Sequence, residues 1–161
     1  MFFGWTALTV LVCPWYACAE TLEVTFINVG HGDSTLIETP AGQKIMIDGG
    51  DKDQGSDTLA PFLLEKGIRR IDKMIVSNND SDHYQGFTDL LADGRFTVGT
   101  LYHSEPFAGA DFPAALSNAV NAAITAGRLG GKVELTTATS PTLDFGAGVT
   151  AELFKAAIVA P

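Results

Sequence analysis

A dense group of oxygen- and nitrogen-bearing side chains follows the apolar run Met74–Val76. It contains two amides, two carboxylates and one imidazole: Asn78, Asn79, Asp80, Asp82 and His83. Short oxygen donors beside an imidazole are the ligands that divalent metal ions use in proteins. The same residue types also dominate ordinary polar turns, so the pattern alone leaves both a metal site and a turn open.

Other kinds of site are excluded by the residues present. A calcium loop of the EF-hand type fails because His83 stands where the sharp turn needs glycine. The sequence has no phosphate-cradling P-loop, no dinucleotide-binding glycine pattern and no serine nucleophile elbow.

Short strands and helices must position this polar group. Alternating apolar and polar residues predict strands over 22–29, 35–39 and 44–48, joined by tight turns into an antiparallel meander. We expect further strands over 74–76, reached by a link over 68–72, and over 97–103, 132–137 and 149–155, and helices over 57–66, 87–92 and 111–126. Asp111 is the expected cap of the last helix, and the glycines of 127–131 are expected to break it. The polar group then lies at the carboxyl end of a strand, where open α/β sheets commonly place ligands.

Length and composition suit a single globular domain. The chain has 161 residues, of which 46% are hydrophobic. Its net charge of −9 argues against a general nucleic-acid-binding surface. An enzyme that acts on phosphate esters stays open, because bound cations reverse the local field.

The first nineteen residues predict a secretory signal peptide. Residues 1–19 carry no charged side chain and end in the small residues Ala17-Cys18-Ala19. An uncleaved membrane anchor is the alternative. After cleavage we expect a periplasmic or secreted chain over 20–161, with no membrane span. Both cysteines, Cys13 and Cys18, would leave with the leader, so no disulfide, thiolate nucleophile or cysteine metal ligand is expected.

Three motifs in fixed order resemble a known family. Asn28–Ser34 resembles the Val-Gly-Gln-Gly-Asp-Ser turn, and Ile45–Gly50 the Ile-Leu-Ile-Asp-Gly-Gly strand end, of metallo-β-lactamase-fold hydrolase domains. Ser77–Gly86 resembles their His-x-His-x-Asp-His metal motif. The similarity is to the soluble domain attached to ComEC-type DNA-uptake channels and to its exported relatives.

The resemblance implies a fold, a site and a cofactor. The fold is an α/β metallo-β-lactamase-like αββα sandwich, of which 20–161 would form a partial domain, the first half. Asn78 and Asp80 stand at the positions of the first metal's ligands, and Asp82 and His83 at those of the second. Asp82 is the residue expected to be essential for catalysis. Zinc is the ion of the family, whereas this oxygen-rich set favours manganese or magnesium.

Two functions follow from the resemblance. One is an exported metal-dependent hydrolase acting on a phosphodiester or another small ester substrate. The other is a non-catalytic truncated remnant or partner-binding module, favoured because a later bridging Asp and a last His of the family have no match here. The oligomeric state is left undefined by the sequence.

Four further residues have open roles. Asp48 is expected either to orient a metal ligand or to cap a turn. His31 and Asp33 are expected to be turn residues without a metal or base role. His103 is expected at the surface or in a polar network.

Overall fold

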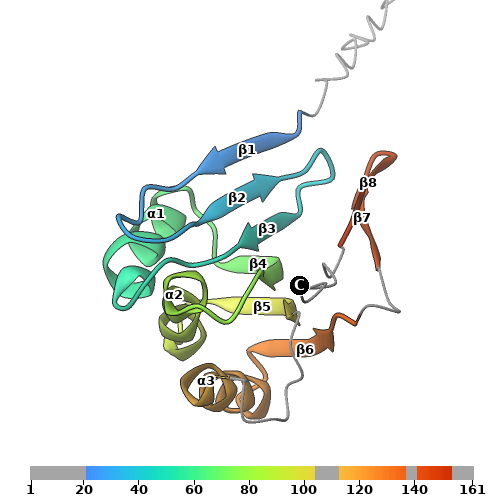
Figure 1. Cartoon of the computed structure of the whole chain (residues 1–161). Helices are drawn as coiled ribbons and strands as arrows, with labels where there is room; N and C mark the ends of the chain where they lie inside the picture. The colour runs from blue at the N-terminus through green and yellow to red at the C-terminus, as the bar shows by residue number, and fades with distance from the viewer. Residues whose placement is uncertain (1–20, 104–112, 137–140, 154–161) are drawn as a thin grey trace, which may run out of the picture.

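The computed structural model describes residues 21–103, 113–136 and 141–153 (Figure 1). The expected leader, the Asp111 cap and the last two residues of the strand expected over 149–155 lie outside these ranges. The elements in chain order are β1 (Glu23–Phe26), β2 (Thr35–Glu38), β3 (Lys44–Ile47), η1 (Gly55–Leu59), α1 (Ala60–Glu65), β4 (Arg70–Val76), α2 (Ser81–Ala92), β5 (Thr97–His103), α3 (Ala114–Thr125), β6 (Leu129–Glu134), β7 (Thr142–Gly146) and β8 (Val149–Glu152). Within the described ranges, no helix is long and apolar enough to cross a bilayer.

Strands β1 to β6 form one sheet in sequential order. The pairs β1–β2 and β2–β3 are antiparallel, which confirms the predicted meander. From β3 to β6 the strands run parallel, and a helix connects each successive pair. Figure 1 shows α1, α2 and α3 on the same side of the sheet. Crossovers of one hand that all step in one direction along a sheet place their helices on one face.

The helical face of the sheet carries the larger apolar core. Met46, Met74 and Leu101 project from the central strands and are fully buried. Leu63 of α1 and Phe87 of α2 belong to the same cluster and are also fully buried. Burial of apolar side chains is the main favourable term in folding. This core therefore holds the strands and helices together and positions the sheet edge on which the polar residues lie.

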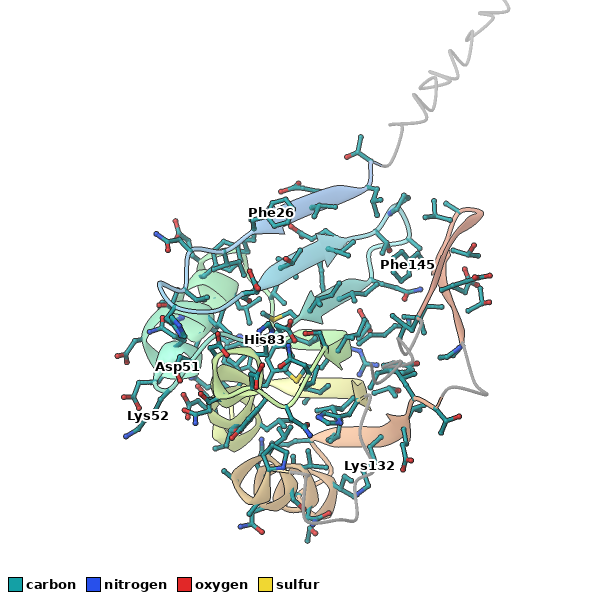
Figure 2. The ribbon with its side chains drawn as sticks, viewed as in Figure 1. Phe26, Asp51, Lys52, His83, Lys132 and Phe145 are labelled. Atoms are coloured by element: carbon teal, nitrogen blue, oxygen red, sulfur yellow. The ribbon has the colours of Figure 1, made fainter. Side chains whose placement is uncertain are left out.

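The opposite face of the sheet is covered by a two-stranded hairpin, β7–β8 (Figure 1). Leu143 and Phe145 of β7 pack with Ile45 and Ile75 of the sheet in a second buried cluster (Figure 2). The Gln43 side-chain amide also donates to the Asp144 carbonyl at 3.1 Å. The chain therefore has a helical layer, a mixed sheet and a second β layer, which confirms the predicted α/β metallo-β-lactamase-like class.

Several predicted element bounds differ from the observed ones. Strand β1 ends at Phe26 rather than at residue 29, and the helix expected over 57–66 consists of η1 and α1. Helix α2 begins at Ser81 rather than at residue 87, because its first turn is polar and carries no apolar stripe. Strand β6 includes Gly130 and Gly131, which were expected to lie in a break. A Cβ on Gly130 would lie 2.6 Å from the Gly99 carbonyl oxygen, so close packing of the strands requires glycine there. Strand β7, Thr142–Gly146, was not predicted.

Candidate metal and hydrolysis site

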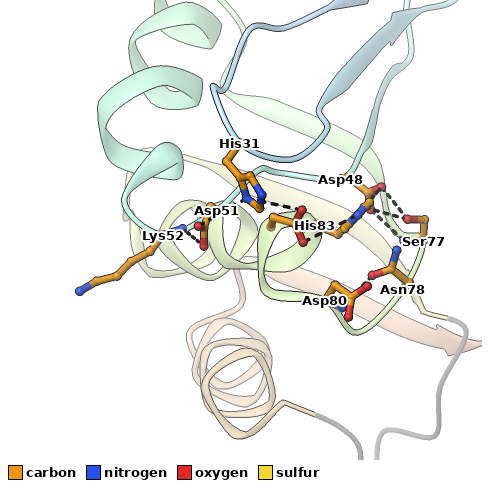
Figure 3. Close-up of polar contacts among 9 residues, drawn as sticks. His31, Asp48, Asp51, Lys52, Ser77, Asn78, Asp80 and His83 are labelled. Carbon is orange, nitrogen blue, oxygen red and sulfur yellow. Dashed lines mark hydrogen bonds and ion pairs between the residues drawn. The ribbon is translucent and has the colours of Figure 1, made fainter.

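The three sequence motifs meet at one edge of the sheet. Strands β1, β3 and β4 all end at this edge, because β1 and β3 are each antiparallel to β2 and β3 is parallel to β4. The loops that follow these strands and the first turn of α2 bring together the polar residues shown in Figure 3. The predicted placement at the carboxyl ends of parallel strands is therefore confirmed.

Asp48 is the buried centre of this cluster. It directly follows β3, has a left-handed backbone with φ 56°, and is only 4% exposed. Its carboxylate accepts the Ser77 backbone N–H at 2.8 Å and the Ser77 hydroxyl at 2.6 Å. The Ser34 hydroxyl donates to the Asp48 carbonyl at 3.0 Å. These contacts tie the ends of β3 and β4 together and satisfy a carboxylate that would be costly to bury alone.

The same carboxylate holds the imidazole of His83. Asp48 Oδ2 lies 2.8 Å from His83 Nδ1, and the Ser77 hydroxyl lies 3.2 Å from the same nitrogen. A proton on Nδ1 donated to Asp48 leaves the lone pair of Nε2 available. Of the two roles considered for Asp48, the structure thus shows the contact needed to orient His83, together with the capping of Ser77.

The pKa of His83 is raised above its ordinary value. Burial is the largest single influence and acts to lower this pKa, because it penalises the imidazolium. The hydrogen bond and charge of Asp48, with the charges of Asp82 and Asp33, outweigh burial and favour the protonated ring. Asp33 therefore contributes negative charge to the site. Its backbone carbonyl also accepts the Gly50 N–H at 3.0 Å, which is a turn contact.

Asp82 lies in the first turn of α2, near the Nε2 nitrogen of His83 and on the other side of the ring from Asp48. Asp82 Oδ1 is 3.9 Å from His83 Nε2, which is too long for a hydrogen bond. Two donors on one tetrahedral ion at about 2.0–2.2 Å lie roughly 3.3–3.6 Å apart, so the two side chains would need to approach each other slightly to share an ion. Asp80, and not Asp82, occupies the N-cap position of the helix. A carboxylate in the first turn is also favoured by the helix dipole.

His31 lies closer to the site than the sequence indicated. It is in the loop after β1, as expected, and its Nδ1 lies 3.6 Å from Asp82 Oδ2 and 3.9 Å from Asp51 Oδ2 (Figure 3). The side chain is 79% exposed, so these are loose surface contacts. Its position inside the first motif was the only sequence signal, and only the fold brings that loop against α2.

Glycines allow the three motifs to approach each other. A Cβ on Gly32 would lie 2.0 Å from the Asp82 carbonyl oxygen, and one on Gly86 would lie 1.9 Å from the Gly49 carbonyl oxygen. The Gly49 N–H donates to the His83 carbonyl at 2.7 Å. The glycines of the motifs therefore hold the first turns of α2 directly against both loops.

Asn78 and Asp80 lie next to this centre but are arranged as a turn. The Asn78 side-chain oxygen accepts the Asp80 backbone N–H at 2.7 Å, which forms an Asx turn. Asp80 is exposed, and its side chain makes no capping hydrogen bond to the helix. Across the described ranges, no group of three or more His, Cys, Asp or Glu side chains is arranged to hold a metal ion. The donor chemistry of Asp82 and His83 fits a divalent ion, and these two supply a pair of ligands rather than a full set.

His103 lies at the same edge of the sheet, where it pairs in register with Val76 at the end of β4. It ends β5 and is fully buried, so the surface alternative is wrong. Its backbone carbonyl accepts the Leu135 N–H at 2.8 Å, which continues the pairing of β5 with the chain after β6.

Comparison with known proteins gives the family. Residues 27–143 match the model of the metallo-beta-lactamase superfamily. The chain is 35% identical over 83 residues to Competence protein ComA of Neisseria gonorrhoeae, covering 52% of this chain and 11% of that protein. It is 30% identical over 111 residues to ComE operon protein 3 of Bacillus subtilis (strain 168), covering 56% of this chain and 14% of that protein. The chain thus spans a small part of the length of both relatives. With its mixed sheet and its three converging motifs, this chain belongs to the metallo-beta-lactamase superfamily.

Proposed function

We propose that this chain is a metal-dependent hydrolase that acts on a phosphodiester or another ester. The observation that carries the proposal is the contact between the buried Asp48 carboxylate and His83 Nδ1 at 2.8 Å. A carboxylate behind an imidazole fixes the tautomer and ring orientation that a metal ligand needs. The superfamily membership of the chain supports the same reaction class.

In this proposal Asp82 and His83 hold a divalent ion, with Asp80 and Asn78 as further donors. When bound, the ion lowers the pKa of a water and polarises the ester. Asp48 holds the proton of His83 Nδ1, so that Nε2 points its lone pair towards Asp82. The mixed oxygen and nitrogen donors suit manganese or magnesium, with zinc as the ion the superfamily suggests.

The central test is metal binding measured separately from activity. Calorimetric titration of the full chain with manganese, magnesium and zinc is expected to show binding. Asp82→Asn should abolish it, together with hydrolysis of a generic phosphodiester. Asp48→Asn should weaken metal affinity about 10–100-fold, because the imidazole loses its support. Asp57→Asn is the matched control, since this exposed carboxylate lies in the first turn of η1.

Two outcomes contradict the hydrolase. One is the absence of metal binding and of hydrolysis with each ion added. The other is an Asp82→Asn variant that behaves like Asp57→Asn in both measurements.

A second candidate, a non-catalytic module that binds a partner, is favoured by one observation. In the part of the chain that the structure describes, no three potential ligands converge on a metal position. A folded protein that binds none of the three ions supports this candidate over the hydrolase.

Export is part of the proposal. Residues 1–19 lack charge and end in small residues, which favours cleavage before Glu20 and a periplasmic or secreted product. N-terminal sequencing of protein from a fractionated host tests this directly. A cytoplasmic chain that still begins at Met1 contradicts export.

A further inference from the structure

Lysine and arginine side chains gather at the edge of the sheet opposite to the candidate hydrolysis site. Two adjoining hollows there are lined by six of the chain's ten basic residues: Lys44, Lys66, Arg69, Arg70, Lys73 and Arg128. The carboxylates that line the same hollows are Glu38 and Asp72. The whole chain carries a net charge of −9, so its basic side chains are concentrated at this edge while the rest of the protein is strongly acidic.

The larger hollow, here called the basic hollow, lies where strands β4, β5 and β6 begin. Its volume is about 680 Å³, within the range of small-molecule pockets. Gly99, Gly127 and Gly130 line it without side chains and leave their backbone accessible. Thr97 and Thr100 add hydroxyls, so the walls are mostly polar.

Arg70 is held in position at the basic hollow. Its Nε donates to Asp72 Oδ1 at 3.0 Å, and the Lys44 backbone N–H donates to Asp72 Oδ2 at 2.9 Å. Arg70 Nη2 lies 3.5 Å from the place that a Cβ on Gly99 would take. The guanidinium therefore extends over the glycine-lined part of the hollow. A planar guanidinium held from one side offers its remaining N–H groups to a phosphate in a two-pronged contact.

Two further cations at the basic hollow are held by neutral oxygens. Lys73 Nζ donates to Gln43 Oε1 at 2.5 Å, and Gln43 is in turn fixed by the hairpin carbonyl of Asp144. Arg128 Nη1 donates to the Leu91 carbonyl at 2.5 Å. The neutral acceptor of Lys73 fixes that side chain in place without cancelling its charge. The carboxylate of Asp93, whose carbonyl also accepts from Arg128 Nη1 at 3.3 Å, offsets part of the Arg128 charge.

We propose that the basic hollow binds a small ligand that carries two or more phosphate groups. Arg70 and Lys73 contact separate phosphates, and Arg128 adds long-range attraction from its anchored position. The hollow is distinct from the candidate hydrolysis site. Arg70 and Val76 are the two ends of the seven-residue strand β4, a distance of about 20 Å along the strand. The proposal does not depend on the metal ligands or on hydrolysis.

The test is calorimetric titration of the full chain with inorganic tripolyphosphate at low ionic strength. Tripolyphosphate is expected to bind at least about tenfold more tightly than orthophosphate, because each phosphate adds charge-assisted hydrogen bonds. Arg70→Gln and Lys73→Gln should each weaken tripolyphosphate binding about tenfold. Lys52→Gln, which removes the same charge from an exposed residue beyond β3, should leave binding unchanged. Thermal melting of each variant checks that the fold is retained.

A second titration, with a nucleoside triphosphate, distinguishes a nucleotide ligand from a phosphate chain alone. A nucleoside triphosphate that binds more tightly than tripolyphosphate identifies a nucleotide, and equal binding identifies the phosphate chain alone; both support the site. Absence of tripolyphosphate binding at millimolar concentration overturns the proposal. So does a Lys52→Gln variant that weakens binding as much as Arg70→Gln, since the attraction would then come from diffuse charge.

Discussion

Asp48 Oδ2 and His83 Nδ1 lie 2.8 Å apart, and this contact joins the loop after β3 to the first turn of α2. The two residues are 35 positions apart in the chain, and each belongs to a different motif. The contact sets both the protonation of the imidazole and the direction of its second nitrogen.

Replacing Asp48 by Asn should lower the pKa of His83, because the hydrogen bond and charge that oppose burial are lost. In the parent protein the folded-state pKa of His83 is raised above 6.5. Protonation of His83 therefore stabilises the folded state, and this contribution is at its full size below pH 6.5. This stability is lost as pH rises through the folded pKa. NMR titration of the imidazole in metal-free protein measures the shift, and Asp80→Asn is the matched control. An unchanged His83 pKa in Asp48→Asn contradicts the assignment.

Gly86→Ala should destabilise the fold, because the added Cβ would lie 1.9 Å from the Gly49 carbonyl oxygen. Overpacking against backbone typically costs about 1–3 kcal/mol, and the free energy of unfolding in urea measures it. Gly94→Ala is the control, since a Cβ there meets nothing within 4 Å. Equal stability of the two variants would show that α2 does not press on the Gly49 loop.

Phe145→Ala should destabilise the protein by about 3 kcal/mol, because this ring is 5% exposed and packs on Ile45 and Ile75. Phe26→Ala removes the same ring from β1, where it is 82% exposed, and should change the free energy of unfolding by less than about 0.5 kcal/mol (Figure 2). Chemical denaturation compares the two. A small effect of Phe145→Ala would mean that the hairpin adds little to the core.

Glu38→Gln should reduce stability at neutral pH by about 0.5–1 kcal/mol. Hydrogen bonds from Lys44 and Lys66 hold the pKa of Glu38 below 4.5, against the opposing effect of burial. A lowered folded pKa gives stability that is present above pH 4.5 and is lost as pH falls through the folded value. The difference from the parent should therefore shrink in acid, as denaturation at several pH values measures. Glu65→Gln, at an exposed carboxylate in the last turn of α1, removes the same charge and is the matched control.

Much of the fold could be predicted from the sequence because its signals are local. The strand pattern predicted β2 and β3 to within one residue, and strand β5 has the bounds that were expected, 97–103. The start of α2 was missed because its first turn is made of the polar site residues, which carry no periodic apolar pattern. Strand β7 was missed because its glycine-containing neighbourhood is typical of a turn.

The candidate site, like the fold, could be predicted from the sequence only in part. Residue type and order by themselves determined which side chains could donate to a metal ion, among them Asp82 and His83, and that Asp48 precedes a glycine pair. Only the tertiary structure decided that Asp48 supports His83, that His31 lies against Asp82, and that the basic side chains gather at the far edge of the sheet. The physical reason is that donor chemistry belongs to each side chain, whereas distance and direction between side chains are set by how the strands pair and the helices pack.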